Sequence, residues 1–177
     1  DVVIVGAGIS GMTAAREAFN RGMKNVLIVD YQDKIGGFTL PFQDQPTFVR
    51  EKELFTETDQ LPYEIWLQST VIGFFPGEDG ENHQLYVQTP DDTYTVETKK
   101  ILIASGAVGK PRENLMVAGS RPAGVMTPMM AANLIQKGYG LGEHIILMDN
   151  GRITSGLRHM INDLGEAVEV IDELEWN

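Results

Sequence analysis

The chain has 177 residues, no cysteine and a formal net charge of −11 at pH 7. Its composition is typical of a soluble globular protein, and no apolar run approaches the roughly 20 residues that cross a bilayer, so we expect no membrane span. The acidic balance argues against nucleic-acid binding, and the lack of cysteine excludes redox disulfides, thiolate nucleophiles, iron–sulfur clusters and cysteine-ligated zinc. No signal peptide opens the sequence, so we expect a cytoplasmic protein.

The start of the chain has the pattern of a strand, a helix and a second strand. Residues 2–5 are a short β-branched apolar run that ends at a glycine, as in a central parallel strand. Residues 10–21 place apolar side chains, Phe19 among them, on one helical face, which predicts a helix packed on the sheet. A second buried strand at residues 26–29 ends at Asp30 and completes a βαβ unit.

The middle of the chain gives weaker helix signals and stronger strand signals. The segment 41–62 carries three prolines and several charges without a clear period, so we expect a loop or a short irregular helix. Beyond it, apolar and β-branched runs joined by the turn residues 90–92 predict an antiparallel meander followed by one more buried strand. These strands are expected at residues 66–75, 84–89, 93–97 and 100–105.

A second strand–helix–strand pattern stands near the end of the sequence. Thr127 followed by Pro128 is a helix cap with proline in the first turn, and Gly138 is a stop signal, so a helix is expected between them. An apolar strand, a helix and a strand ending at Asp172 then repeat the order seen at the start of the chain. These elements are expected at residues 144–148, 153–164 and 167–171.

Three glycines lie between the first strand and the first helix, in the spacing Gly6-x-Gly8-x-x-Gly11. Gly6 permits a tight turn, Gly8 permits a pyrophosphate to approach the backbone, and Gly11 permits the helix to lie against the strand. The amino end of the helix then offers free N–H groups and a partial positive charge to phosphates. This context favours a dinucleotide site over the alternative that the glycines only form a tight turn.

Asp30 lies 19 residues beyond Gly11, at the end of the second strand. A carboxylate there accepts hydrogen bonds from the hydroxyls of an adenosine ribose and repels a 2′-phosphate, so NADP is disfavoured. The corresponding stretch of the second unit, residues 148–154, keeps only the middle glycine, Gly151, and has Asp149 where a phosphate would lie. A structural role is therefore favoured for the second unit over dinucleotide binding in the usual way.

Two further segments complete a family pattern. Gly36 and Gly37 stand six and seven residues after Asp30, and Ala104-Ser105-Gly106 ends the strand expected at 100–105. With the first glycine motif, these segments resemble the FAD/NAD(P)-dependent oxidoreductases with two dinucleotide-binding domains. The resemblance implies that the first motif and Asp30 hold the FAD adenosine and that the diglycine carries the chain along the cofactor. It also implies that the strand end, which has serine where the family has threonine, returns the sheet to the cofactor.

Within that superfamily, residues 121–127 and the helix and strand after them resemble flavoprotein subunits of the sarcosine oxidase α, opine oxidase and hydrogen cyanide synthase type. This resemblance implies FAD as the cofactor, with NAD as an alternative for the first site, and other subunits of an oxidoreductase complex as partners. It also implies that the backbone of Val71 bonds to adenine. The stretch between Gly37 and Val71 is short for the family and the family's C-terminal Gly-Asp element is absent, so we expect the chain to hold only part of a cofactor.

The fold class expected from these patterns is α/β. We expect a Rossmann-like FAD-binding domain, with a parallel sheet and an antiparallel β-meander, at residues 1–116 and a partial, degenerate second Rossmann-like unit at residues 117–177. The residues expected to bind the cofactor are Gly6, Ala7, Gly8, Ile9, Ser10, Gly11, Asp30, Tyr31, Gly36, Gly37, Val71, Ala104, Ser105 and Gly106.

The sequence identifies no general acid, base or nucleophile. Its three histidines, His83, His144 and His159, lack metal-ligand spacing, so we expect no metal site. Aromatic residues of the strand 66–75 are interpreted as core or cross-strand packing.

We therefore expect an FAD-dependent oxidoreductase chain, or a fragment of one, that oxidises an amine, an amino acid or a hydroxy compound. Electrons would pass to another subunit or acceptor, since the chain has no cysteine pair to take them. Two alternatives stay open. One is a non-catalytic cofactor-binding or structural subunit of a hetero-oligomer, and the other is an NAD-binding dehydrogenase subunit.

Overall fold

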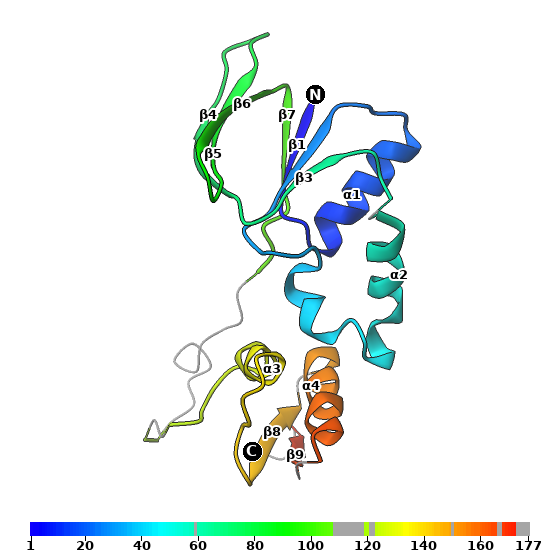
Figure 1. Cartoon of the computed structure of the whole chain (residues 1–177), viewed down its shortest axis with the longest axis vertical. Coiled ribbons are helices and arrows are strands. Elements are labelled where there is room, and N and C mark those ends of the chain that lie inside the picture. Colours follow the sequence, from blue (N-terminus) through cyan, green and yellow to red (C-terminus); the bar gives the residue numbers. More distant parts are fainter. Residues whose placement is uncertain (59, 108–118, 121–122, 150, 166–167, 173–177) are drawn as a thin grey trace. The chain divides into compact units, whose positions relative to one another are not determined.

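The computed structural model describes the whole chain apart from residues 59, 108–118, 121–122, 150, 166–167 and 173–177 (Figure 1). The chain separates into two compact units. Unit 1 comprises Asp1–Leu40 and Arg50–Gly106, and unit 2 comprises Pro41–Val49 and Ala107–Asn177. Pro41–Val49 thus belongs to unit 2, although the sequence placed it in the first domain. The boundary expected between residues 116 and 117 stays a prediction.

Unit 1 contains a parallel sheet of short apolar strands. In spatial order these strands are β3 (Glu64–Trp66), β2 (Val26–Val29), β1 (Val2–Val5) and β7 (Lys100–Ile103). Val3 of the central strand β1 pairs with Leu27 on one side and with Ile101 on the other. Val3 and Ile4 are 2% and 1% exposed, which is expected of a strand that is covered on both faces.

Helix α1 (Ile9–Asn20) covers one face of this sheet. Met12 and Ala15 are buried in one core with Ile4. Phe19 was expected on the same face, and its ring does meet that of Tyr63, a residue of the same core, edge-on at 6.4 Å, but Phe19 is 47% exposed. A 12-residue helix is about 18 Å long, whereas a four-residue strand spans about 13 Å, so the last helical turn extends past the sheet.

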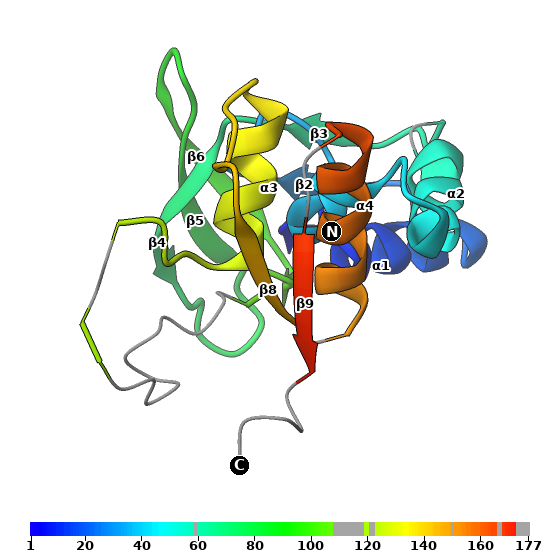
Figure 2. The same ribbon diagram turned by 90° about the horizontal axis from the view of Figure 1, so that it is seen from below.

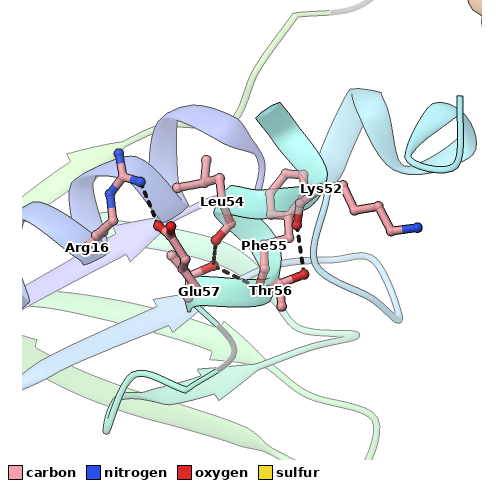
Figure 3. A network of polar contacts seen from close by, with 7 residues as sticks. Arg16, Lys52, Leu54, Phe55, Thr56 and Glu57 are labelled. Atoms are coloured by element: carbon pink, nitrogen blue, oxygen red, sulfur yellow. Dashed lines mark hydrogen bonds and ion pairs between the residues drawn. The ribbon is translucent and has the colours of Figure 1, made fainter. Parts of the chain in front are cut away.

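Helix α2 (Val49–Thr58) lies in the segment 41–62, where a loop or a short irregular helix was expected. It buries Leu54 in the core that α1 also enters. An ion pair of 2.9 Å joins Arg16 of α1 to Glu57 of α2 (Figure 3). The regular helix was missed because charged residues occupy much of its surface and leave only a short apolar stripe. Two 3₁₀ turns precede it, η1 (Gly37–Phe42) and η2 (Pro46–Phe48).

An antiparallel meander packs on the other face of the parallel sheet, as predicted. Its strands, in spatial order, are β4 (Thr70–Phe75), β5 (His83–Gln88) and β6 (Thr93–Thr98). Leu85 and Val87 of β5 are buried in one core with Val3 and Val29 of the parallel sheet. Unit 1 therefore has three layers, a helical layer, a parallel sheet and a meander, and the predicted α/β fold of Rossmann type is confirmed.

The single strand expected at residues 66–75 is in fact two strands in different sheets. Trp66 ends β3 beside β2, and Thr70 begins β4 in the meander. Between them, Gln68 has φ 50°, a left-handed conformation through which the chain turns from one sheet to the other. The break was missed because apolar residues continue on both sides of it. The aromatic residues of β4 do make cross-strand pairs, Phe75 with Tyr86 and Phe74 with His83.

Unit 2 contains the strand–helix–strand order predicted for its end. Its elements are α3 (Pro128–Gln136), β8 (Ile145–Asp149), α4 (Arg152–Asp163) and β9 (Val168–Asp172). Figure 2 shows the parallel strands β8 and β9 side by side. The side chain of Thr127 caps α3 by accepting a hydrogen bond from the Met130 amide at 3.3 Å, and Gly138 follows the helix with φ 81°, so both signals read from the sequence are confirmed.

The core of unit 2 draws on residues far apart in sequence. Leu147 of β8 and Leu157 and Ile161 of α4 are buried together with Phe42 and Phe48. Both phenylalanines come from the segment that precedes α2. No helix in the part of the chain that the structure describes is long and apolar enough to span a membrane.

Candidate functional site

Two glycines of the first motif are required by packing within unit 1. Gly6 has φ 112°, and a Cβ there would lie 2.2 Å from the carbonyl oxygen of Ala104. A Cβ on Gly11 would lie 1.8 Å from the carbonyl oxygen of Gly6. Both distances are shorter than any real contact of a Cβ. Gly6 therefore allows β1 and β7 to meet at their carboxyl ends, and Gly11 allows α1 to lie directly against the turn.

Gly8 is different, because the protein itself does not require glycine there. Its φ of −80° and ψ of −170° suit any residue. A Cβ on Gly8 would meet the Cα of Gly37 at 3.7 Å, an ordinary contact, and no other atom within 4 Å. The expected close approach of a pyrophosphate to the Gly8 backbone therefore stays a prediction, with room for it beside this residue.

The amino end of α1 is ready to receive an anion. Gly8 is the N-cap residue, no side chain caps the helix, and its first turn contains no acidic residue. The first amides of an α-helix have no acceptor within the helix, and the helix dipole adds partial positive charge there. Ile9, Ser10 and Gly11 belong to this turn, so the predicted loop can bind phosphate oxygens with backbone N–H groups.

The predicted diglycine lies beside the glycine loop. The Gly36 amide donates to the carbonyl of Ala7 at 3.0 Å. Gly37 has φ 54°, and a Cβ on it would lie 2.8 Å from the Cα of Gly8. The hydroxyl and the amide of Thr39 both donate to the Gly36 carbonyl, at 3.0 and 3.2 Å, which holds the diglycine in this turn. The structure therefore brings together Ala7, Gly8, Gly36 and Gly37.

Asp30 is buried, with 5% exposure, at the end of β2. Its Oδ2 accepts a hydrogen bond from the Ala7 amide at 2.5 Å, and its Oδ1 accepts one from the Gln32 amide at 2.8 Å. The carboxylate thus ties the end of β2 to the glycine loop before any ligand is considered. Each carboxylate oxygen accepts more than one hydrogen bond, so the expected contact to a ribose hydroxyl stays a prediction.

A backbone clip that the sequence did not suggest joins the ends of β2 and β3. The Ser69 amide donates to the carbonyl of Asp30, and the Gln68 amide donates to the carbonyl of Gln32, both at 2.8 Å. The clip starts β4 next to Asp30, and β4 is an edge strand of the meander. Val71 follows the clip by two residues. It lies on β4, which pairs with β5 along one edge only. Hydrogen bonds between backbone groups leave no residue-type signal, which is why this feature was missed.

The remaining predicted residues lie around these elements. Tyr31 is 70% exposed directly after Asp30. The amide of Ala104 donates to the carbonyl of Val5 at 2.8 Å, so the strand end at 104–106 adjoins the glycine turn. A groove of about 590 Å³ is lined by Ser10, Thr13, Ala14 and Glu17 of α1 and by Leu102–Gly106.

Metal ligands do not cluster in the described part of the chain, where no group of three or more His, Asp or Glu residues could hold an ion. Tyr63 lies in the core that α1 also enters, and its hydroxyl donates to the carbonyl of Met23 at 2.7 Å. Burial raises the pKa of the Tyr63 hydroxyl above its ordinary value.

A family model described as pyridine nucleotide-disulphide oxidoreductase matches residues 1–176. Among characterised proteins, the chain is similar to the flavin-containing amine oxidase B of Bos taurus and of Homo sapiens, each 44% identical over 45 residues. These matches cover 25% of this chain and 8% of the amine oxidases.

Among solved structures, the chain is similar to L-proline dehydrogenase from P. horikoshii, with a TM-score of 0.71 and 20% identity over 97% of this chain. It is also similar to the ornithine N-hydroxylase of Kutzneria sp. 744, with a TM-score of 0.66 and 16% identity over 97% of this chain. The chain spans 35% and 52% of the length of these two proteins. At these identities the likeness is one of fold.

Proposed function

Because the chain belongs to the pyridine nucleotide-disulphide oxidoreductase family, we propose that it is the dinucleotide-binding part of an FAD-dependent oxidoreductase. Membership of this family confirms the superfamily expected from the sequence. The observation that carries the proposal is the glycine at position 8, whose conformation and surroundings give the protein no reason of its own to exclude a side chain.

The pyrophosphate is assigned to the amino end of α1. Gly8 leaves the backbone accessible, and the amides of the first helical turn supply donors and partial positive charge. The diglycine lies beside this loop, where the Gly36 amide donates to the Ala7 carbonyl and a Cβ on Gly37 would come within 2.8 Å of the Cα of Gly8. A ligand at Gly8 would thus meet a loop whose shape is already set, which reduces the entropy lost on binding.

The adenosine is assigned to the end of β2. Asp30 would accept hydrogen bonds from the ribose hydroxyls, using carboxylate lone pairs that the Ala7 and Gln32 amides do not occupy. Its charge would repel a 2′-phosphate. Tyr31 offers an exposed ring beside the ribose position, and the backbone of Val71 would bond to the adenine edge. The strand end at 104–106 would lie near the rest of the cofactor.

FAD is proposed in preference to NAD for this site. The support is the 44% identity over 45 residues to amine oxidases that are described as flavin-containing. When bound, FAD supplies the hydride or electron transfer, and the residues of this chain bind and orient it. NAD in the same site is the alternative that the experiment below tests.

We further propose that the substrate is an amine, an amino acid or a hydroxy compound. The absence of cysteine means that electrons leave to an acceptor or a subunit outside this chain rather than to a disulfide within it. A role as a subunit of a larger oxidoreductase complex and a cytoplasmic location are parts of the same proposal.

The test is binding of FAD, ADP, FMN and NAD to the purified chain by isothermal calorimetry, with Gly8→Ala as the matched variant. We expect FAD and ADP to bind, FMN to bind weakly because it lacks the adenosine, and Gly8→Ala to lower FAD and ADP affinity by about tenfold or more, since a methyl group would fill the phosphate approach. Binding of NAD without FAD would replace the flavin assignment. Unchanged ADP binding by Gly8→Ala would refute the site.

A further inference from the structure

The second βαβ unit follows the course of the first but has a different loop. Gly151 caps α4 with φ 85° and ψ −147°, whereas Gly8 caps α1 with φ −80° and ψ −170°. Thr154 stands where α1 has Gly11, and its hydroxyl donates to the carbonyl of Gly151 at 3.2 Å. The Thr154 residue is 1% exposed. A side chain therefore fits at the place where α1 lies too close to its turn to admit one.

The start of α4 is bound by another part of the same chain. Arg152, the first residue of the helix, donates from Nη2 to the carbonyl of Thr47 at 2.5 Å. Its guanidinium lies 4.7 Å from the centre of the Phe48 ring. A charge-assisted hydrogen bond and a cation–π contact thus act on two consecutive residues of the segment Pro41–Val49.

The two phenylalanines of that segment pack against the next turn of α4. Phe42 and Phe48 stack with centroids 5.3 Å apart at 22° and are 0% and 1% exposed. A Cβ on Gly156 would lie 2.8 Å from Phe42 and 3.0 Å from Phe48. Gly156 therefore allows α4 to pack closely against the two rings, just as Gly11 allows α1 to pack closely against the turn of the first unit.

We propose that the second βαβ unit holds the chain's own segment Pro41–Val49 in place of a nucleotide, with Arg152 as the positioning residue, so that the chain binds one dinucleotide and not two. The sequence agrees with that, because the second unit keeps only one of the three glycines of the first motif, Gly151.

One consequence follows for the reaction. A nicotinamide nucleotide is not held by the second unit, so the hydride that reaches the cofactor of the first site comes from another donor. This consequence rests on the proposed function of unit 1, whereas the anchoring of the segment does not.

Hydrogen exchange tests the anchoring. The amides of Gln45 and Phe48 donate to the carbonyls of Phe42 and Gln45, each at 2.9 Å, and report on the shape of the segment. We expect Arg152→Ala to speed exchange of these amides by about tenfold or more, and Arg152→Lys, which keeps a charged donor, to restore most of the protection. Arg158→Ala, which removes an exposed arginine of the same helix, is the control. Unchanged exchange in Arg152→Ala would overturn the proposal.

Titration with ADP tests the number of sites. We expect one ADP per chain in the wild type, and in Gly8→Ala the same single site with an affinity lower by about tenfold or more. A second ADP in the wild type, or binding that keeps its wild-type affinity in Gly8→Ala and is removed by Arg152→Ala, would overturn the assignment of α4 to the segment. A wild-type chain that binds no ADP would instead refute the proposed function of unit 1, while the exchange experiment would still decide the role of Arg152.

Discussion

The carboxylate of Asp30 accepts a hydrogen bond from the amide of Ala7 at 2.5 Å, across 23 residues of sequence. Its other oxygen accepts from the amide of Gln32. The residue that the sequence assigns to ribose binding is therefore also the residue that holds the phosphate loop against β2. In the proposed site, one buried side chain would thus join the adenosine and pyrophosphate ends, and we expect changes at Asp30 to affect both.

Asp30→Asn should destabilise unit 1 as well as weaken nucleotide binding. The amide group of asparagine would leave one of the two backbone N–H groups facing a second donor, at a cost of about 1–3 kcal/mol. The free energy of unfolding, measured with urea, and ADP affinity should both fall. Asp33→Asn changes the same charge at an exposed position nearby and is the control. Equal unfolding midpoints for Asp30→Asn and wild type would contradict the role assigned to the carboxylate.

Gly6→Ala and Gly8→Ala should separate folding from binding. At Gly6 the added methyl group meets the backbone of Ala104 and the residue must keep φ 112°, so we expect a loss of about 3 kcal/mol or more. At Gly8 the conformation suits alanine, and the free energy of unfolding should stay within about 1 kcal/mol of the wild type. Urea unfolding of both variants is the measurement, and a Gly8→Ala protein that unfolds as easily as Gly6→Ala would be inconsistent with the geometry.

Tyr63 should make unit 1 less stable at high pH. Burial raises the pKa of its hydroxyl above the ordinary 10.0, so the folded state holds the proton more tightly than the unfolded chain. Stability is therefore fully present below pH 10 and falls as pH rises above it. In Tyr63→Phe this fall should be smaller, and the lost hydrogen bond to Met23 should cost about 0.5–1.5 kcal/mol at neutral pH.

The measurement is the urea midpoint at neutral pH and again above pH 10, for wild type and Tyr63→Phe. Tyr31→Phe, at a residue that is 70% exposed, serves as the control and should keep the alkaline loss of the wild type. If Tyr63→Phe lost as much stability as the wild type at high pH, another group would be responsible.

Gly156→Ala should destabilise unit 2, although alanine favours helices. The intrinsic gain is about 1 kcal/mol, but the new Cβ would press on the two buried rings of Phe42 and Phe48, and overpacking of this kind costs about 1–3 kcal/mol. We expect a lower thermal midpoint for unit 2 and faster exchange of the Phe48 amide. A more stable variant would mean that the rings can move away, and that Gly156 is not needed for their packing.

Much of unit 1 could be predicted because its signals are local. Val2–Val5 and Val26–Val29 are short β-branched runs, and the glycines at positions 6, 8 and 11 stand in a fixed relation to the strand and helix around them. The same holds for Thr127 and Gly138 at the ends of α3. Errors arose where a local signal was weak or misleading. Charged residues hid α2, and continuous apolar residues hid the turn at Gln68.

By itself, the sequence determined the kind of loop, the spacing of its glycines and the acid at the end of β2, because these depend on residue types a few positions apart. Only the tertiary structure decided which glycines the packing of the protein needs and which it does not, since that depends on atoms of Ala104 and Gly37 brought close by folding. It also decided that Arg152 donates a hydrogen bond to Thr47 and that Gly156 packs against Phe42 and Phe48. Contacts between residues about a hundred positions apart arise from packing, and a pattern of neighbouring residues does not record them.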